Sequence, residues 1–212
     1  MLARRFLKSR GDTLIEVLFA TATFSLVAVG GIAIMNKGTA ASQRALEITL
    51  VRNEIDSQAE TLRFLNASYI AAYQPGVSNY GSDTPAQEWK TMHDNIVATN
   101  ASSATSFGSN GTSCPTLPKG SFILNTRKAK FVSSISGKFA DADTYSKVAY
   151  DASSQLINTY GIWIEAVRST TSGDVNQADA GYIDFYINAC WYSSGQVQPV
   201  TIGTIVRLYE PR

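Results

Sequence analysis

The chain has 212 residues, 44% of them hydrophobic, and its 18 basic and 17 acidic residues give a net charge of +1. This even balance is not that of a nucleic-acid-binding domain, and the length predicts one globular domain beyond a terminal segment. Because His93 is the only histidine and nothing around it has metal-ligand spacing, a Cys-His metal site is not expected.

The first 35 residues combine a basic stretch with a long apolar run. From Leu14 to Met35 the run is 22 residues long. A helix of that length spans about 33 Å, enough to cross the hydrocarbon core of a bilayer. The basic residues before the run place the N-terminus in the cytoplasm and the rest of the chain outside, by the positive-inside rule. They are Arg4, Arg5, Lys8 and Arg10.

Glu16 is a carboxylate near the start of this run. Because a charge inside a membrane segment is costly, it suggests a function by itself. A secretory signal is cut after its apolar region, at an Ala-x-Ala-like sequence, but residues 36–39 offer no such site. The candidate scissile residue is instead Gly11, before the run. Cleavage there removes a short basic leader and leaves the hydrophobic segment in the mature chain.

Residues 11–18 read Gly-Asp-Thr-Leu-Ile-Glu-Val-Leu, which resembles the leader-cleavage signature of type IV prepilins and pseudopilins. That signature is a glycine, a variable residue that is usually Phe, then Thr-Leu-Ile-Glu and an apolar helix. The resemblance implies that a membrane aspartyl peptidase, the prepilin peptidase, cuts between Gly11 and Asp12 and that the new amine of Asp12 is methylated. It also implies that Glu16 neutralises the N-terminal amine of a neighbouring subunit during filament assembly.

Pairing of Glu16 with an amine is physically sound, because each charge loses solvation in hydrocarbon and recovers part of it in the pair. The alternative is that Thr13 and Glu16 form a capping box that closes the first helical turn. Asp12 departs from the family pattern. Its carboxylate suits a helix N-terminus, but it competes with Glu16 for the amine.

Helical periodicity continues beyond the apolar run and ends at Pro75–Gly76. We expect one helix from about residue 13 to residue 73, with a membrane or filament-core part at 12–36 and an amphipathic continuation at 37–74. The apolar stripe consists of Ile48, Val51, Ile55, Ala59, Leu62, Leu65, Tyr69 and Tyr73. The opposite side is expected to carry Glu47, Glu54, Ser57 and Thr61. Such a stripe fits a helix packed under a head or a coiled-coil stalk, and the strand-rich remainder favours the head.

Residues 75–212 are expected to form a globular head with a short helix near Pro85–Val97 and a polar loop at 136–146. Strands are predicted at Ser121–Thr126, Ala129–Ile135, Tyr160–Arg168, Gly181–Tyr192 and Thr201–Tyr209. The last two strands are expected to pair. A helix followed by strands predicts an α+β fold in which the long N-terminal helix packs against a C-terminal antiparallel β-sheet head. The pilin family has the same arrangement.

Cys114 and Cys190 both lie in the part of the chain predicted to be outside the cell, where two cysteines typically form a disulfide. The bridge would close a loop of about 75 residues and contribute on the order of 4 kcal/mol in the chain-entropy model. It would pin the Gly/Ser/Pro-rich segment 100–120 onto a C-terminal strand. Two free thiols are the alternative.

Other patterns have both a structural and a functional explanation. Arg127, Lys128 and Lys130 fit a solvated strand edge better than a DNA contact, because the chain without residues 1–11 has 14 basic and 17 acidic residues, a net charge of −3. The acidic loops at 141–143 and 174–179 fit solvated turns better than calcium sites. The aromatic residues of the last third fit cross-strand packing better than a sugar-binding platform.

The sequence contains no Gly-x-Ser-x-Gly motif, phosphate-binding glycine loop or paired histidine ligands, so neither catalysis nor a cofactor or metal is expected. The sequence therefore predicts a structural subunit of a type IV pilus or a pilus-like filament, with a slight preference for a minor or tip subunit. The alternatives are a membrane-anchored binding module, such as an adhesin, that does not polymerise, and a type II secretion pseudopilin.

The predicted partners are copies of this chain, other pilin subunits, the prepilin peptidase, the pilus assembly machinery in the membrane, and the lipid bilayer before assembly. A DNA or host-surface ligand has no support in the sequence. The expected location is the cytoplasmic membrane, as a single-pass protein with its N-terminus inside and its head outside, and afterwards an extracellular filament.

Overall fold

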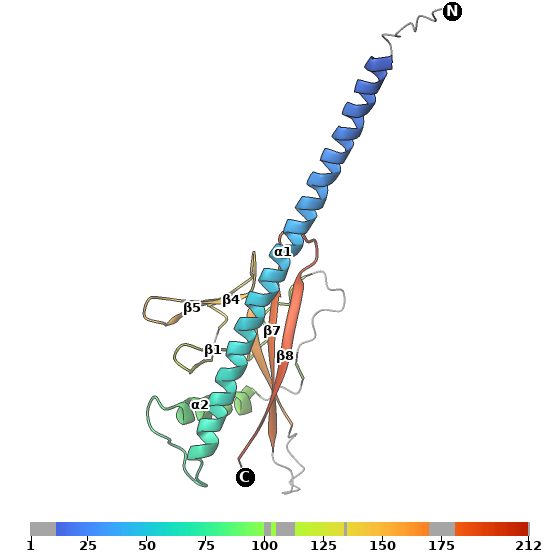
Figure 1. Ribbon diagram of the computed structural model, residues 1–212. Coiled ribbons are helices and arrows are strands. Elements are labelled where there is room, and N and C mark those ends of the chain that lie inside the picture. Colours follow the sequence, from blue (N-terminus) through green and yellow to red (C-terminus); the bar gives the residue numbers. More distant parts are fainter. Residues whose placement is uncertain (1–11, 100–102, 105–112, 134, 170–180, 212) are drawn as a thin grey trace, which may run out of the picture. The chain divides into compact units, whose positions relative to one another are not determined.

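The computed structural model describes residues 12–99, 103–104, 113–133, 135–169 and 181–211, and these residues contain two helices and eight strands. The chain divides into two compact units, residues 1–43 and residues 44–212. Helix α1, Asp12–Ala72, begins in the first unit and ends in the second (Figure 1). The long helix expected from the sequence is therefore present.

In the first unit every described residue is helical. The hydroxyl groups of Thr21, Thr23 and Ser25 donate hydrogen bonds of 2.7–3.0 Å to backbone carbonyls three or four residues earlier. Bonds of this kind satisfy a hydroxyl within its own helix. The three polar residues therefore need no water, and they do not interrupt the apolar surface of the segment.

In the second unit one face of α1 is covered by the head. Val51, Leu62 and Leu65 are fully buried, and Ile55 and Ala59 are nearly so. Ile48 and Tyr69 are partly buried against the same core. The apolar stripe predicted from the sequence is therefore the face of α1 that packs against the head.

The prediction for the opposite side of α1 is wrong. Thr61 is buried, and Glu47, Glu54 and Ser57 are partly covered. The buried face is wider than its apolar stripe, because it also includes polar residues such as Gln58 that contact the head through hydrogen bonds. The exposed polar row consists of Arg52, Asp56, Glu60 and Arg63.

Helix α2, Pro85–Thr99, matches the short helix expected at Pro85–Val97 and is two residues longer. The hydroxyl of Thr84 accepts a hydrogen bond of 3.2 Å from the backbone N–H of Gln87, which caps the first turn. Buried residues recur at steps of three and four, so one face of α2 packs on the core. They are Ala86, Trp89, Met92 and Ile96.

The largest sheet contains β6 (Ile162–Arg168), β7 (Tyr182–Trp191) and β8 (Val200–Tyr209), in that order and antiparallel. The expected pairing of the last two strands is confirmed, with Tyr186 opposite Ile205. Alternate residues of β7 are fully buried, so one face of the sheet forms the core. These residues are Ile183, Phe185, Ile187 and Ala189.

Two smaller sheets complete the head. Strands β1 (Ile123–Asn125) and β2 (Lys130–Val132) form an antiparallel pair inside the two segments predicted as strands. The third sheet has the order β3-β5-β4. Its strands are β3 (Phe139–Ala140), β4 (Lys147–Tyr150) and β5 (Leu156–Tyr160).

This third sheet corrects two expectations. Residues 136–146 are not only a polar loop, because they contain β3, and β3 pairs with β5 in parallel rather than antiparallel. The strands β4 and β5 were not predicted at all. A strand as short as β3 is too short to show the alternation of apolar and polar residues by which strands are recognised.

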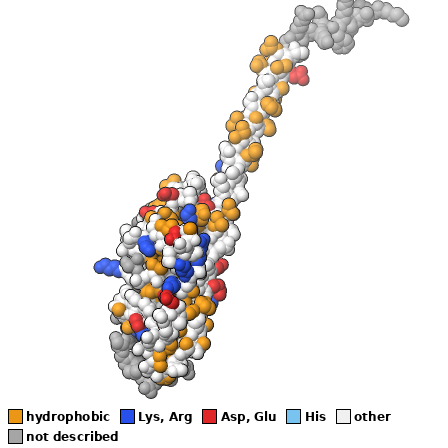
Figure 2. Space-filling model, turned by 90° about the vertical axis from the view of Figure 1, so that its left-hand side faces the viewer, with side chains coloured by type: hydrophobic (Ala, Val, Ile, Leu, Met, Phe, Trp, Pro, Cys, Tyr) orange, Lys and Arg blue, Asp and Glu red, His pale blue; other side chains and the backbone are white. Residues whose placement is uncertain are grey.

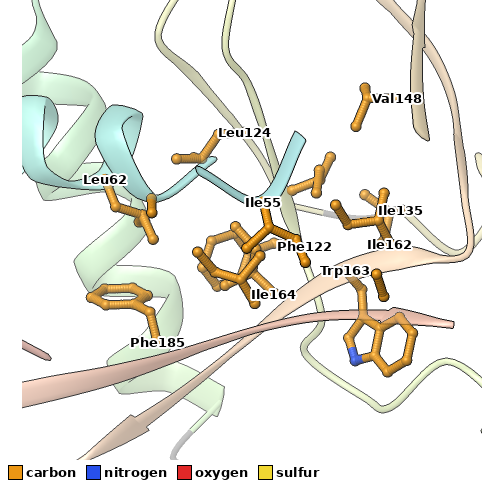
Figure 3. Packing of buried hydrophobic residues seen from close by; sticks show 14 of the residues in the cluster. Ile55, Leu62, Phe122, Leu124, Ile135, Val148, Ile162, Trp163, Ile164 and Phe185 are labelled. Carbon is orange, nitrogen blue, oxygen red and sulfur yellow. The ribbon is translucent and has the colours of Figure 1, made fainter. Parts of the chain in front are cut away.

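The core joins α1 to the sheets. Figure 3 shows Ile55 and Leu62 of α1 packed with Phe122, Ile164 and Phe185. Burial of a large apolar side chain contributes about 1.5–3 kcal/mol, so these contacts hold the C-terminal part of α1 to the head. The fold is therefore α+β, with a long N-terminal helix packed against a mainly antiparallel sheet head.

Candidate functional site

The N-terminal part of α1 has an apolar surface that nothing in the described chain covers. Its large side chains are exposed, with Phe24 at 75% and Leu26 at 77%, and Figure 2 shows hydrophobic side chains along this segment. Soluble proteins rarely expose a continuous apolar surface of this size, which marks a membrane or protein contact. By length and composition, α1 is the one helix in the described residues that could cross a membrane.

Glu16 lies in the second turn of this segment and is exposed. With Ile15, Phe19 and Ala20 it lines a shallow hollow on the helix surface. The helix begins at Asp12, four residues before Glu16. Gly11, the predicted cleavage residue, lies outside the described residues.

One polar contact between α1 and the head involves Gln58, which is fully buried. Its Nε2 donates to the carbonyl of Leu124, and the N–H of Leu124 donates to its Oε1, both at 3.0 Å. The side chain thus pairs with β1 as a neighbouring strand would. The sequence reasoning missed this residue, although a glutamine beside an apolar helical stripe signals a buried hydrogen-bonding role.

Two further hydrogen bonds join α1 to the large sheet. The Nδ2 of Asn66 donates to the carbonyl of Tyr209 at 3.3 Å, and the Nε1 of Trp191 donates to Oε2 of Glu47 at 3.2 Å. Asn66 therefore contacts the last residue of β8, and Glu47 contacts the last residue of β7. These contacts explain why Glu47 is not on the solvent side of the helix.

Glu54 is a partly buried carboxylate on the head side of α1. Its Oε1 has no hydrogen-bond partner among the described residues. Burial raises the pKa of Glu54, while the hydrogen bond from Gln58 and the positive charge of Arg127 lower it by less. The carboxylate is therefore a site where the ionised form is disfavoured in the folded chain.

Cys114 and Cys190 form the predicted disulfide. Cys190 lies in β7, and its carbonyl accepts a hydrogen bond of 3.1 Å from the hydroxyl of Ser146. Its N–H donates to the carbonyl of Gly161 at 2.8 Å. Gly161 has a φ of +60°, and a Cβ there would collide with the Cys190 carbonyl, so only glycine fits. The bridge thus fixes the segment around Cys114 to β7.

The basic cluster does not form an open array of charges. The guanidinium of Arg127 lies 4.4 Å from the centre of the Tyr150 ring, and Lys130 pairs with Asp83 at 2.5 Å. The pairing raises the pKa of Lys130 and lowers the pKa of Asp83. Two of the three basic residues therefore have partners within the chain. Only Lys130 lies in a strand, because Arg127 and Lys128 belong to the turn that joins β1 to β2.

A cluster of charged and titratable side chains lies at the end of the large sheet where β6 and β8 terminate. The Nε2 of His93, on α2, lies 2.8 Å from Oε1 of Glu210, and Arg168 reaches the same oxygen at 3.4 Å. The hydrogen bond from His93 is the main cause of a lowered pKa at Glu210. This group joins α2, β6 and the residue after β8.

The aromatic residues of the last third mostly serve packing. Trp163, Phe185 and Trp191 are buried, and Tyr182 packs edge-on against Tyr209 across the strands at 6.2 Å between ring centres. Of the acidic loops, residues 141 and 143 are exposed, whereas 174–179 lie outside the described residues. Among the described residues, no group of three or more His, Cys, Asp or Glu side chains is placed to hold a metal ion.

Comparison with known proteins adds no relative to this description. No family model matches the chain, and no curated protein or solved structure was found to be similar to it.

Proposed function

We propose that the chain is a structural subunit of a type IV pilus or a pilus-like filament. The prepilin peptidase cuts after Gly11, the mature chain begins at Asp12, and the amine of Asp12 is methylated. Copies then polymerise through residues 14–35 of α1. The observation that best supports this proposal is one uncovered apolar segment with the carboxylate of Glu16 in its second turn.

The physics of assembly follows from this segment. Before assembly, lipid covers the apolar side chains of this segment. After assembly, apolar side chains of neighbouring subunits cover them. Lipid tails are as apolar as leucine, so the transfer itself gives little hydrophobic gain, and close packing and polar pairing must drive it. An unpaired Glu16 in hydrocarbon costs several kcal/mol, which pairing with a neighbour's N-terminal amine offsets in one axial register.

The head is the part that a filament exposes. Gln58 and Asn66 hold it to α1, and the Cys114–Cys190 disulfide stabilises it outside the cell. The subunit is first a single-pass protein of the cytoplasmic membrane with its N-terminus inside, and then part of an extracellular filament. The Thr-Leu-Ile-Glu-Val-Leu form of its signature and the size of its head favour a minor or tip subunit.

Substitution of Glu16 distinguishes a filament subunit from a membrane-anchored module that does not polymerise. In a filament subunit, Glu16→Leu abolishes filaments in the sheared fraction while the chain still accumulates in membranes. Asp56→Asn, at an exposed carboxylate of the same helix, is the matched control and leaves filaments unchanged. Normal filaments from Glu16→Leu would contradict the proposal, because an anchor tolerates an apolar residue there.

A further inference from the structure

Glu54 is a partly buried carboxylate at the contact between α1 and the head. Its Oε1 is closed off from solvent and has no hydrogen-bond partner among the described residues. The amide of Gln58 donates a hydrogen bond to the same carboxyl group and also pairs with Leu124 of β1. The flanking charged residues of α1, Arg52 and Asp56, are exposed. A change in the charge of Glu54 therefore acts at the point where the helix binds β1.

The cation that acts on Glu54 from the head is Arg127, in the turn that joins β1 to β2. Its positive charge lowers the pKa of Glu54, but burial raises this pKa by more. The guanidinium is placed on another group, because its carbon lies 4.4 Å from the centre of the Tyr150 ring. An aromatic ring and a carboxylate both attract a guanidinium. Arg127 thus has two competing partners, the ring of Tyr150 and the carboxyl group of Glu54.

The ring of Tyr150, in β4, is a fixed partner. Its hydroxyl lies 3.0 Å from Oγ1 of Thr126 and accepts a hydrogen bond of 3.4 Å from the N–H of Thr126. Burial raises the pKa of Tyr150, and the charge of Glu54 raises it further. The ring therefore stays neutral over the pH range in which carboxyl groups titrate, and its attraction for Arg127 does not change there.

The other cations of the elements around Glu54 are placed elsewhere. Lys128, in the same turn as Arg127, is exposed. Lys147 of β4 has its Nζ 5.3 Å and 5.8 Å from the ring centres of Tyr145 and Tyr160. Strand β1 has no titratable side chain. Within the described part of the head, Arg127 is therefore the cation that can answer a charge on this carboxyl group.

We propose that Glu54, Arg127 and Tyr150 form a pH-sensitive switch at the contact between α1 and the head. With a proton on Glu54 the carboxyl group is neutral, and Arg127 stacks on Tyr150, which is the arrangement of the structure. When the proton leaves to solvent, a partly buried carboxylate remains without a counter-charge, which is costly. The guanidinium then leaves the ring and pairs with Glu54. All three residues lie in the second compact unit, so the switch does not require filament assembly.

The switch changes a surface of the head. Arg127 and Lys128 line a shallow hollow together with Thr61 and Phe64 of α1. When the guanidinium turns to Glu54, the rim of this hollow loses one of its two cations to an internal ion pair. The turn between β1 and β2 is then tied to α1 instead of to β4. The charge and the shape of this surface therefore depend on pH.

An NMR titration of the full chain in detergent, from about pH 3 to pH 8, tests the switch. The side-chain carboxyl carbon of Glu54 reports ionisation, and the Cδ protons of Arg127 report stacking, because the ring current of Tyr150 shifts them upfield. The variants Glu54→Gln and Arg127→Lys assign these signals, since each removes one of them. We expect the upfield shift to be present at low pH and to be lost with the same midpoint as Glu54, above the ordinary value of a glutamate. In Glu54→Gln the shift should persist at every pH.

The matched control is Asp56→Asn, at an exposed carboxylate of the same helix, which should leave both midpoints unchanged. An upfield shift of Arg127 that stays constant while Glu54 ionises would overturn the inference, because the guanidinium would not have moved. A shift that is still lost with pH in Glu54→Gln would show that another group drives the movement. If that variant does not fold, the unsubstituted chain decides alone: different midpoints for Glu54 and Arg127 would also overturn the inference.

Discussion

Gln58 of α1 and Leu124 of β1 exchange two hydrogen bonds of 3.0 Å, one in each direction between a side chain and a backbone unit. The side chain of Gln58 in α1 thereby satisfies the N–H and the carbonyl of Leu124 in β1, and β1 pairs with β2 as its neighbouring strand. Since a buried backbone group without a partner is costly, this contact fixes the position of the head along the C-terminal part of α1.

Substitution Gln58→Ala should destabilise the head strongly. It leaves the N–H and the carbonyl of Leu124 buried without partners, at about 1–3 kcal/mol for each group, so we expect a loss of about 3 kcal/mol. Urea unfolding of the full chain in detergent, followed by tryptophan fluorescence, measures the change. The control Asn53→Ala, at an exposed position of the same helix, should change the free energy of unfolding by less than about 0.5 kcal/mol.

Glu54→Gln should stabilise the chain at neutral pH. Burial raises the pKa of this carboxyl in the folded state, so the folded chain binds a proton more tightly than the unfolded chain. Stability is then highest below the unfolded pKa, about 4.3, and falls as the pH rises through the folded pKa. The gain from the variant should be about 1 kcal/mol at pH 7 and should vanish near pH 3. An equal gain at both pH values would contradict this explanation.

Glu210→Gln should have the opposite pH dependence. The hydrogen bond from His93 lowers the pKa of Glu210, so its contribution to stability is present above the unfolded pKa and is lost as the pH falls through the folded pKa. The variant should therefore be less stable than the unsubstituted chain at pH 6 and equally stable below pH of about 3. Unfolding midpoints across this range, with the exposed Asp143→Asn as control, test the prediction.

Replacement of both cysteines by serine should cost on the order of 4 kcal/mol, because the sequence separation of 76 residues makes the closed loop long. The loss is expected mainly through greater conformational entropy of the unfolded chain. Thermal unfolding with and without reductant measures it. An unchanged melting temperature would mean that the bridge does not constrain the unfolded state.

The large features of the fold could be predicted from the sequence because the patterns that indicate them extend over many residues. The apolar run of 22 residues, the helical stripe from Ile48 to Tyr73 and the alternating strand Ile162–Arg168 each extend over several turns or residue pairs. The two cysteines were predicted to pair because both lie in the part of the chain predicted to be outside the cell.

The details that the sequence did not provide depend on tertiary contacts. The two-residue strand β3 becomes a strand only through its pairing with Thr159 and Tyr160. Thr61 and Glu54 were placed on the wrong side of α1, because the head wraps around more of the helix than its apolar residues indicate.

The central claim, that Gly11 is the end of a leader and that the mature chain enters a filament, is tested most directly by intact mass and N-terminal sequencing. The chain is taken from sheared surface filaments and, separately, from membranes. The account predicts a mature chain that begins at Asp12 in the sheared fraction, with a mass shift that corresponds to one methyl group on its amine. A chain found only in membranes and still carrying residues 1–11 would contradict the account and leave an uncleaved, membrane-anchored module.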